Sequence, residues 1–320
     1  MRAVGYTEPG TADVLRSLEL PMPVPGPYEA IVRIAAVGLN FADIYRRRGE
    51  YAVVPPSPFV LGYEGAGVVE YVGSQVKTVK AGDRVAFANV PRANAEYVSA
   101  PETSLVEIPD SISFEQASGV LLQGLTAHYL THDSHALKSG ETILVHSGAG
   151  GVGLFLLQYS RRIGANAIAV VSSEAKAEVA LKAGATEVII NDPAQPKSNW
   201  KPKNRSIDVV YDSVGSTLSD SLDVVRPRGK VVFYGWSGGT AAYVDPRILM
   251  NQSKTLVGGD LWSYVGDPDE LKRRSKQVLA DLKGGVLNLR IDRRFEFARA
   301  SEAHRYLESR QSIGKVLLLP

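Results

Sequence analysis

Residues 141–153 read ETILVHSGAGGVG, an apolar run that passes directly into a glycine-rich turn. The run from Glu141 to His146 predicts a strand, and the apolar residues from about Val152 to Ile163 predict a helix that Gly164 ends. A strand, a tight turn and a helix in this order begin a βαβ unit, and such units build parallel sheets. This stretch therefore decides the class of the fold.

Three glycines of the turn, Gly148, Gly150 and Gly153, fit the pattern G-x-G-x-x-G between a strand and a helix. The first allows a tight turn, the second lets the backbone approach a pyrophosphate, and the third lets the helix pack closely on the strand. The helix N-terminus also offers unpaired N–H groups and a positive dipole end to phosphates. An ordinary strand-to-helix turn is the alternative, but the strands that follow favour a dinucleotide site.

Strands and helices continue to alternate after this turn. Further strands are expected at residues 167–171, 187–190, 207–211, 230–234 and 255–259, with a helix at 175–183. Strands and helices at this spacing require right-handed crossovers and a parallel sheet covered on both faces. The predicted fold class is α/β, with a doubly wound parallel (Rossmann) sheet domain at residues 123–259.

The rest of the chain has a different pattern. Short strand-like segments at residues 30–36, 65–72, 84–88 and 96–100 alternate with clusters of Pro and Gly, which is typical of a small, partly open β-barrel. The last segment predicts a helix at 271–283, a strand at 294–297, a helix at 300–309 and a strand at 315–319. This is too little for an independent domain. We therefore assign residues 1–122 and 260–320 to one domain.

The composition limits the chemistry. Lys and Arg total 36 against 34 Asp and Glu, a formal net charge of +2 that argues against a nucleic-acid partner. The chain has no cysteine, so disulfides, thiolate nucleophiles and cysteine-bound metals are excluded. No apolar run is long enough to cross a membrane, and the first residues lack the pattern of a signal peptide. We expect a cytoplasmic protein.

The end of the second strand of the sheet favours NADPH over NADH. NAD sites usually carry Asp or Glu there to bind the ribose hydroxyls. Here Ser172 and Ser173 follow the strand, and Lys176 comes one turn later. Hydroxyls and an ammonium suit a 2′-phosphate, which a carboxylate would repel. Glu174 argues the other way, since a small shift of the loop would bring it to the ribose.

Further motifs resemble the quinone oxidoreductase/ζ-crystallin family, in the zinc-free branch of the medium-chain dehydrogenase/reductase superfamily. They follow the family's order along almost the whole chain: GLNFAD at 38–43, LGYEGAG at 61–67, AGDRV at 81–85, AEY at 95–97, LTA at 125–127, the glycine turn with Gln158 and Arg161, YDSVG at 211–215 and GKV at 314–316. The resemblance implies a GroES-like, partly open β-barrel domain in addition to the Rossmann domain, and an NADPH-dependent oxidoreductase.

The resemblance also bears on metals. Zinc alcohol dehydrogenases of the same superfamily hold their catalytic metal with Cys, His and Cys, and these positions fall on Asn40, Tyr63 and Gln123 here. None of the three is a normal zinc ligand. The resemblance therefore implies no metal, and a hydride acceptor that needs no Lewis acid, a quinone or an activated alkene.

The family's cofactor contacts carry over position by position. The implied residues are Asn40 and Thr126 near the nicotinamide; Gly148, Ala149, Gly150, Gly151 and Val152 at the pyrophosphate; Ser172, Ser173, Lys176 and Asn191 on the adenosine side; Tyr234, Gly235 and Ser237 in the loop on the nicotinamide side; and Lys315. Asn191 stands where the family often has a tyrosine that helps to bind the 2′-phosphate. Trp236 stands where the family usually has a smaller or polar residue.

Tyr51 and Tyr45 are the candidates for contact with the acceptor oxygen, with Asn40 as a third catalytic candidate. Related enoyl-thioester reductases have a suspected proton-donating tyrosine in a Gly-x-Tyr context, which Gly49-Glu50-Tyr51 fits. Alternatively, both tyrosines cover the barrel and solvent protonates the product, because a phenol with a pKa of about 10 is a poor acid at neutral pH. The adjacent Arg46, Arg47 and Arg48 are expected to form a solvated surface cluster, and attraction of an anionic substrate is the alternative.

The five histidines do not predict a metal site. His128, His132 and His135 could share one helical face, but we interpret them as surface or capping residues of a connecting helix and loop. We expect His146 to pack at the end of the first strand and His304 to lie on the surface.

The sequence thus predicts a zinc-independent, NADPH-dependent quinone oxidoreductase with a small-molecule quinone or enone substrate. A reductase of α,β-unsaturated carbonyl compounds, enones or enoyl-thioesters, is one alternative. An NADPH-binding protein with little turnover is another. The resemblance further implies a homodimer through the edge strand at residues 255–259.

Overall fold

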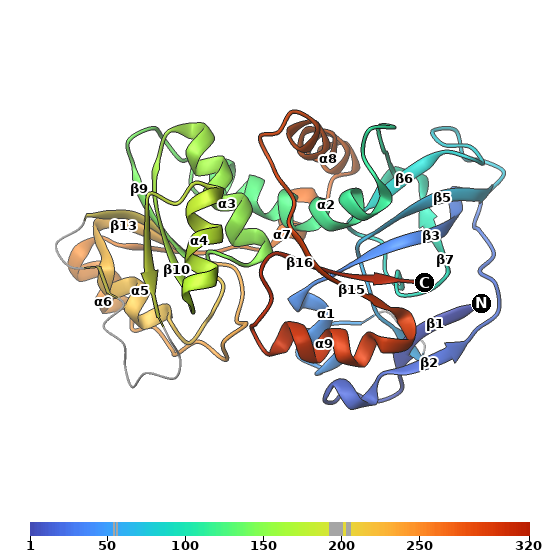
Figure 1. Cartoon of the computed structure of the whole chain (residues 1–320), viewed down its shortest axis with the longest axis horizontal. Helices are drawn as coiled ribbons and strands as arrows, with labels where there is room; N and C mark the ends of the chain where they lie inside the picture. Colours follow the sequence, from blue (N-terminus) through green and yellow to red (C-terminus); the bar gives the residue numbers. More distant parts are fainter. Residues whose placement is uncertain (54, 56, 192–200, 203–205) are drawn as a thin grey trace. The chain divides into compact units, whose positions relative to one another are not determined.

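The computed structural model describes residues 1–53, 55, 57–191, 201–202 and 206–320 (Figure 1). The chain forms two compact units. The first comprises Met1–Leu122, Val265–Gly285 and Leu289–Pro320, and the second comprises Gln123–Tyr264 and Val286–Asn288. The two units are described separately below.

The second unit is built on six parallel strands. They are β9 (Thr142–His146), β10 (Asn166–Val171), β11 (Glu187–Ile190), β12 (Ile207–Asp212), β13 (Val225–Phe233) and β14 (Thr255–Gly258). Their order in the sheet is β11-β10-β9-β12-β13-β14, and every neighbouring pair is parallel. This is the order of a doubly wound dinucleotide-binding sheet, with its switch point between β9 and β12. The predicted fold class is confirmed.

Among the described residues, four helices follow strands of this sheet and lead to later ones: α3 (Gly151–Ile163), α4 (Glu174–Ala183), α5 (Leu218–Val224) and α6 (Pro246–Gln252). A π-helical turn η3 (Leu130–Ser134) precedes β9, and the short α7 (Leu261–Val265) follows β14. The strands are rich in Val, Ile and Leu because residues at their centres are buried. Leu144 on β9, Val210 on β12 and Val231 on β13 have no exposed surface. Burial of each such side chain stabilises the unit by about 1.5–3 kcal/mol.

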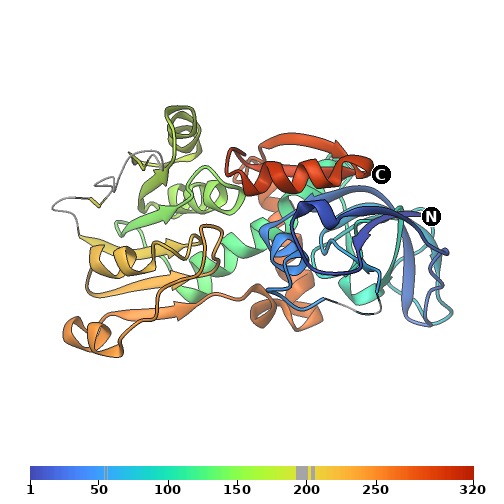
Figure 2. The same cartoon turned by 90° about the horizontal axis from the view of Figure 1, so that it is seen from below.

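The described residues of the first unit form two sheets, and Figure 2 shows its blue N-terminal and red C-terminal segments side by side. A three-stranded sheet has the order β2-β1-β4, with β1 (Arg2–Tyr6), β2 (Arg16–Glu19) and β4 (Phe59–Val60). The larger sheet contains β15-β16-β3-β5-β6-β8, and β7 also pairs with β3. Its strands are β3 (Glu29–Leu39), β5 (Gly65–Val72), β6 (Arg84–Phe87), β7 (Tyr97–Pro101), β8 (Val106–Glu107), β15 (Ile291–Glu296) and β16 (Lys315–Leu319).

The helices of this unit include pieces from both ends of the chain. They are α1 (Phe41–Arg47), α8 (Pro268–Lys283) and α9 (Ala300–Glu308), with short 3-10 turns η1 (Ala12–Val14), η2 (Glu102–Ser104) and η4 (Phe297–Arg299); α2 (Phe114–Tyr129) contains the division between the units. The final strand β16 pairs antiparallel with β3, where Val316 faces Leu39. Both residues belong to one buried apolar cluster, so the end of the chain completes the core of its first third.

Three elements, α8, β13 and β15, begin at least three residues earlier than the sequence predicts. Helix α8 begins at Pro268 instead of Leu271 because the Asp267 carboxylate accepts hydrogen bonds from the N–H groups of Asp269 and Glu270. A carboxylate cap followed by proline at the first helical position is a strong helix start. Strand β13 begins at Val225 because that residue pairs with Ile207 across an irregularity in the ladder.

The expected surface position of His304 is wrong. His304 lies on α9 with no exposed surface, and its Nδ1 is 3.3 Å from Nη1 of Arg47 on α1. Helix α9 packs on α1, and this contact covers the imidazole. None of the helices among the described residues is long and apolar enough to cross a membrane.

Candidate functional site

The glycine-rich turn lies at the carboxyl end of β9. Helix α3 begins at Gly151, with Gly150 as its N-cap residue. A Cβ atom on Gly148 would lie 2.7 Å from the Cβ of Ala169, and one on Gly153 would lie 2.3 Å from the carbonyl oxygen of Ser147. These two positions therefore need glycine for packing alone.

Gly150 differs from them. A Cβ atom there would lie 3.1 Å from the Ser147 oxygen, a tight but much less severe contact. No side chain in the described part of the chain caps α3 at Gly150. The first N–H groups of a helix have no acceptor within the helix. The start of α3 thus presents backbone N–H groups that fit a pyrophosphate.

The predicted adenosine-side residues meet at the end of β10. Lys176 on α4 donates a hydrogen bond from Nζ to Oγ of Ser172 over 3.0 Å. Ser173 is the N-cap residue of α4, and Glu174, the first residue of that helix, is exposed. The N–H of Asn191 donates to the carbonyl oxygen of Val171 at 2.7 Å. Two serines, an ammonium and an amide therefore share one strand end, a set that fits a 2′-phosphate.

The Asp212 carboxylate holds the backbone that follows β12, the strand next to β9 in the sheet. The sequence analysis did not select this residue. The carboxylate is fully buried and accepts hydrogen bonds from the N–H groups of Val214 and Gly215 and from the hydroxyls of Thr217 and Ser221. The Ser221 hydroxyl is also 3.0 Å from Nε2 of His146. Burial lowers the pKa of His146, which favours the neutral ring. His146 is a packing residue, as predicted.

The loop after β13 is held against the same strand end. Tyr234 donates its N–H to the Asp212 carbonyl oxygen at 2.9 Å, and Ser237 donates both its N–H and its hydroxyl to the Ser213 carbonyl oxygen at 3.0 Å. A Cβ atom on Gly215 would lie 2.9 Å from the Cβ of Trp236. The predicted residues Tyr234, Gly235 and Ser237 therefore lie beside the carboxyl end of β12. Thr126, on α2, is buried.

A buried polar cluster in the first unit surrounds Asn40. Lys315 Nζ lies 2.6 Å from Glu64 Oε2 and 2.8 Å from Asn40 Oδ1. Asn40 Nδ2 donates to the same Glu64 oxygen at 2.9 Å and to the Gly38 carbonyl oxygen at 3.0 Å. The N–H of Leu122 donates to the other Glu64 oxygen at 2.7 Å. The amide of Asn40 is thereby fixed in one orientation.

This cluster bears on Lys315, which the resemblance implies as a cofactor-binding residue. Lys315 and Glu64 both have side chains with no exposed surface. The carboxylate and Asn40 take two of the three N–H donors of the ammonium. Its role toward the cofactor remains a prediction. Glu64 itself was missed, because nothing local in the sequence marks its partner in the last strand.

The positions that hold zinc in the related alcohol dehydrogenases do not fit a zinc ion here. Asn40 and Gln123 carry amides and Tyr63 a phenol, whereas zinc takes thiolate, imidazole or carboxylate ligands. The Tyr63 ring is also covered by a guanidinium, with Arg46 Cζ only 3.6 Å from the ring centre. Within the described ranges, no three His, Asp or Glu side chains are grouped to hold a metal ion.

Three of the histidines lie near η3. The rings of His128 and His132 stack with their centres 4.2 Å apart, and His132 Nδ1 lies 2.9 Å from the His128 carbonyl oxygen. His135 Nε2 lies 3.0 Å from a Glu141 oxygen. His128 is buried, which corrects the expectation of a surface residue, while His132 is exposed.

The candidate tyrosines flank an arginine. Tyr45 is buried on α1, with its ring centre 6.2 Å from that of Phe41. Tyr51 is half-buried, and the Cζ atom of Arg46 lies 5.1 Å from its ring centre. The structure thus places Tyr51 and Arg46 together, while Tyr45 packs in the barrel.

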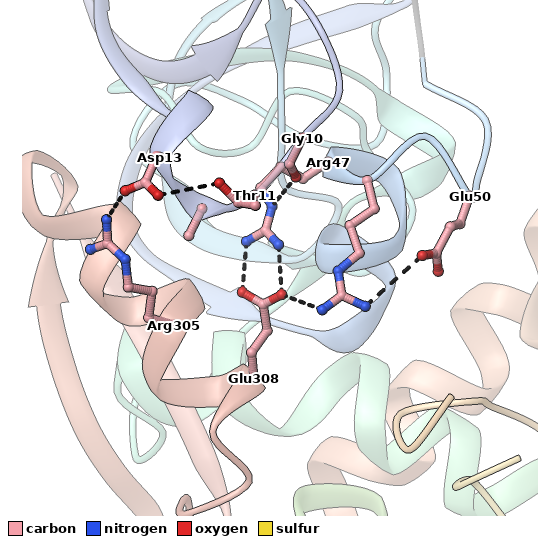
Figure 3. Close-up of a pocket in the computed structure, with 9 residues that line it drawn as sticks. Gly10, Thr11, Asp13, Arg47, Glu50, Arg305 and Glu308 are labelled. Carbon is pink, nitrogen blue, oxygen red and sulfur yellow. Dashed lines mark hydrogen bonds and ion pairs between the residues drawn. The ribbon is translucent and has the colours of Figure 1, made fainter. Parts of the chain in front are cut away.

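The expectation of a solvated arginine cluster is wrong for two of its three members. Arg46 and Arg47 are buried, and only Arg48 is exposed. Arg47 makes a two-pronged ion pair with Glu308 on α9, at 2.9 and 2.6 Å, and Arg48 reaches the same carboxylate at 2.6 Å (Figure 3). Helix α1 turns Arg47 toward α9, so this side chain joins two helices.

Comparison with known proteins identifies the family. A model described as alcohol dehydrogenase GroES-like domain matches residues 26–141, and one described as zinc-binding dehydrogenase matches residues 151–277. A quinone oxidoreductase of Pseudomonas aeruginosa is 40% identical over 324 residues, covering 100% of this chain and 99% of that protein. The chain belongs to the quinone oxidoreductase family.

Two further relatives are similar to this member of the quinone oxidoreductase family over most or all of its length. The crystal structure of Escherichia coli quinone oxidoreductase complexed with NADPH has a TM-score of 0.94 and 35% identity, and covers 100% of both chains. A 2-haloacrylate reductase from a Burkholderia species is 36% identical over 310 residues and covers 92% of both. The predicted family and the two domain types are confirmed.

Proposed function

We propose that this protein is a zinc-independent NADPH:quinone oxidoreductase, which transfers a hydride from the reduced nicotinamide to a quinone. The observation that carries the proposal is the open N-terminus of α3 at the carboxyl end of β9, next to the switch point of a doubly wound sheet. The relatives named quinone oxidoreductase, one of them complexed with NADPH, support the same activity.

The chain's own residues would bind and orient NADPH. Backbone N–H groups of Gly151 and Val152 would hold the pyrophosphate, which could approach closely at Gly150, and Lys176 with Ser172 would hold the 2′-phosphate. Asn40, fixed by Glu64 and Lys315, would position the nicotinamide. When bound, NADPH supplies the hydride, and the protein supplies its orientation and a dry pocket.

Besides the hydride, the reaction needs a proton. Reduction of a quinone to a quinol takes one hydride from NADPH, which becomes NADP⁺, and one proton. Tyr51 is the candidate donor of this proton, and solvent is the alternative source. The amide and phenol groups at the zinc positions support a reaction without a Lewis acid.

The test is a direct assay. Purified protein is mixed with NADPH, and the loss of NADPH absorbance is followed before and after addition of 1,4-naphthoquinone. We expect loss that depends on both protein and acceptor, and faster turnover with NADPH than with NADH. Tight binding of NADPH without acceptor-dependent oxidation would refute the enzyme in favour of a binding protein.

Reduction of α,β-unsaturated carbonyl compounds is the second candidate. The observation that favours it is the 2-haloacrylate reductase among the relatives, whose named substrate is an activated alkene carrying a carboxylate. Here the hydride would go to the β-carbon and one proton to the α-carbon. Replacing the quinone with enones and enoyl-thioesters in the same assay separates the two candidates.

We also propose a cytoplasmic homodimer that pairs through β14. This strand stands at the end of the six-stranded order, and no other strand of the described ranges pairs with its outer edge. An unpaired edge is a ready site for association between copies. Light scattering after gel filtration would give the mass, and a monomer at micromolar concentration would exclude the dimer.

A further inference from the structure

Helix α1 ends in three consecutive arginines that have different partners. Arg47 and Arg48 share the Glu308 carboxylate. Arg46 points elsewhere, and only 3% of it is exposed. Its Nε donates to the Ala52 carbonyl oxygen at 3.2 Å, while Nη1 is buried and has no hydrogen-bond partner among the described residues.

No carboxylate in the described part of the chain forms an ion pair with Arg46. Asp43, one turn earlier on α1, uses Oδ2 to accept the N–H of Asn40, and its Oδ1 has no hydrogen-bond partner among the residues that the structure describes. Burial raises the pKa of Asp43, which favours the neutral acid and weakens it as a counter-charge, although Arg46 acts in the opposite direction. A guanidinium buried without a partner is costly, because it loses its hydration and gains no ion pair in return.

Two aromatic rings hold this guanidinium in place. Arg46 Cζ lies 3.6 Å from the ring centre of Tyr63 and 5.1 Å from that of Tyr51. Rings over the face of a guanidinium attract its charge but leave its N–H edge for an acceptor in the plane. A carboxylate is such an acceptor, and it binds the edge of an arginine in a fixed geometry.

We propose that Arg46 is a specificity-determining residue that binds an anionic oxygen group, such as a carboxylate, carried by the hydride acceptor. The anionic group of the ligand thereby provides the negative counter-charge that no described carboxylate of the protein provides for the Arg46 guanidinium. This inference rests on the proposed reductase function, because it is Tyr51, the candidate acceptor contact, that lies beside Arg46. The acceptor class is an enone or quinone with a carboxylate close to its reducible double bond.

A pocket lined by Arg47 and Arg48, the other two arginines of the run, differs from the surroundings of Arg46 because its charges are paired. It has a volume of about 580 Å³ and is lined by Arg47, Arg48 and Arg305 together with three acidic residues (Figure 3). Each arginine there already pairs with a carboxylate, Arg305 with Asp13 and the other two with Glu308. Its charges are balanced, and it gives no reason to expect an anion. Arg46 is distinguished from these neighbours by its Nη1, which has no hydrogen-bond partner in the described part of the chain.

The test uses two acceptors, 3-benzoylacrylate and its methyl ester, of which only the first carries a charge; their intrinsic difference in reactivity cancels when two protein variants are compared. The ratio of their kcat/KM values is measured in the unmodified protein and in Arg46→Met. A hydrogen bond between charged groups corresponds to a preference of about tenfold or more. We expect the ratio of acid to ester to fall by about tenfold in Arg46→Met, with the change largely in KM.

The matched control is Arg48→Met, which removes the same charge from the same helix end at an exposed position. We expect its ratio to stay within about twofold, because exposed charges are screened. A ratio that does not change in Arg46→Met, or that changes equally in both variants, overturns the inference. The proposed function stands or falls separately, on whether 1,4-naphthoquinone is reduced at all.

A binding measurement covers the case in which Arg46→Met does not fold. Calorimetry compares 3-benzoylpropionate, the saturated product, with its methyl ester on the unmodified protein loaded with NADP⁺. Tighter binding of the acid by about tenfold supports the inference. Equal binding of acid and ester contradicts it.

Discussion

Lys315 Nζ lies 2.6 Å from Glu64 Oε2, and neither side chain has any exposed surface. Glu64 precedes β5 and Lys315 begins β16, so the pair joins the first third of the chain to its last strand. Asn40 bonds to both partners and sits at the start of α1. One buried ion pair thus fixes the orientation of the residue that the family places near the nicotinamide.

Lys315→Met should destabilise the first unit strongly. The substitution leaves the Glu64 carboxylate buried without a cation, and breaking a buried pair from one side costs about 3–5 kcal/mol. Urea unfolding followed by fluorescence measures the loss. The double variant Glu64→Gln with Lys315→Met should recover most of it, because neither position of the pair then carries a charge. A loss below about 1 kcal/mol in the single variant would show that the carboxylate is neutral or solvated.

Gly150→Ala and Gly153→Ala should separate nucleotide binding from folding. A Cβ on Gly153 meets the Ser147 oxygen at 2.3 Å, so that variant should lose about 1–3 kcal/mol of stability. At Gly150 the same contact is 3.1 Å, and the protein should fold normally. Its added methyl group stands where the backbone would approach a phosphate, so NADPH affinity should fall by about tenfold or more. Calorimetry and thermal unfolding report the two properties.

If Gly150→Ala binds NADPH as tightly as the unmodified protein, the pyrophosphate does not lie at this turn. Gly82→Ala is a suitable control for the effect of a methyl group on an unrelated glycine, because no atom lies within 4 Å of a Cβ there. Its backbone φ of +91° adds strain, so the control is judged by NADPH affinity and not by stability.

The doubly wound sheet could be predicted from the sequence because its evidence is local. The apolar run at residues 142–146, the glycines after it and the alternation of strands and helices all act within a few residues of one another. The same holds for the Ser172 and Lys176 pair, which are four residues apart across the start of a helix. Patterns of this kind survive in the folded structure because the backbone geometry imposes them.

The buried charged residues could not be predicted in this way. Lys315 and Glu64 are separated by 251 positions, and Arg47 and Glu308 by 261. Arg46, Arg47 and Arg48 look alike as a sequence, and ordinary expectation places such a run in solvent. They differ in burial and in partners because each side chain leaves α1 in a different direction. Arg47 and Arg48 reach Glu308 on α9, and Arg46 reaches the Ala52 carbonyl oxygen. Only the tertiary structure contains this information.

Lys176→Met should weaken NADPH binding and leave NADH binding unchanged. The ammonium that now reaches Ser172 would lose a charge-assisted contact with the 2′-phosphate, which NADH lacks. The expected loss in NADPH affinity is about tenfold to a hundredfold. Fluorescence titration with each coenzyme measures it. Lys182→Met, an exposed position on the same helix, controls for general electrostatics. An equal loss of affinity for NADPH and NADH would mean that Lys176 does not contact the 2′-phosphate.

Tyr51→Phe tests the source of the proton. If the Tyr51 hydroxyl donates in the rate-limiting step, kcat should fall by about a hundredfold, in line with general acid catalysis elsewhere. We expect this fall with enone acceptors, in which one carbon must be protonated. Tyr45→Phe should retain activity within a few-fold, since Tyr45 is a buried residue packed near Phe41. Unchanged kcat in Tyr51→Phe would assign protonation to solvent.

His304 should make the first unit sensitive to acid. Burial, with a smaller contribution from the adjacent Arg47, lowers the pKa of His304 from 6.5 to about 3 in the folded protein. The unfolded chain therefore binds a proton between these values that the folded chain does not. Stability from this group is complete above the unfolded pKa and is lost as pH falls from there toward 3. Between about pH 7 and about pH 5, the loss due to His304 should be about 2 kcal/mol.

Comparison with His304→Gln isolates this contribution from that of the carboxylates. We expect urea unfolding of the variant to depend less on pH over the same interval, by about 2 kcal/mol, because its amide does not titrate. His132→Gln makes the same substitution at an exposed histidine and serves as the control. If His304→Gln and the unmodified protein lose stability in parallel, the imidazole must take up its proton in the folded state as readily as in the unfolded chain. Such a charge would lie 3.3 Å from the Arg47 guanidinium, and Glu308 would then have to balance both cations.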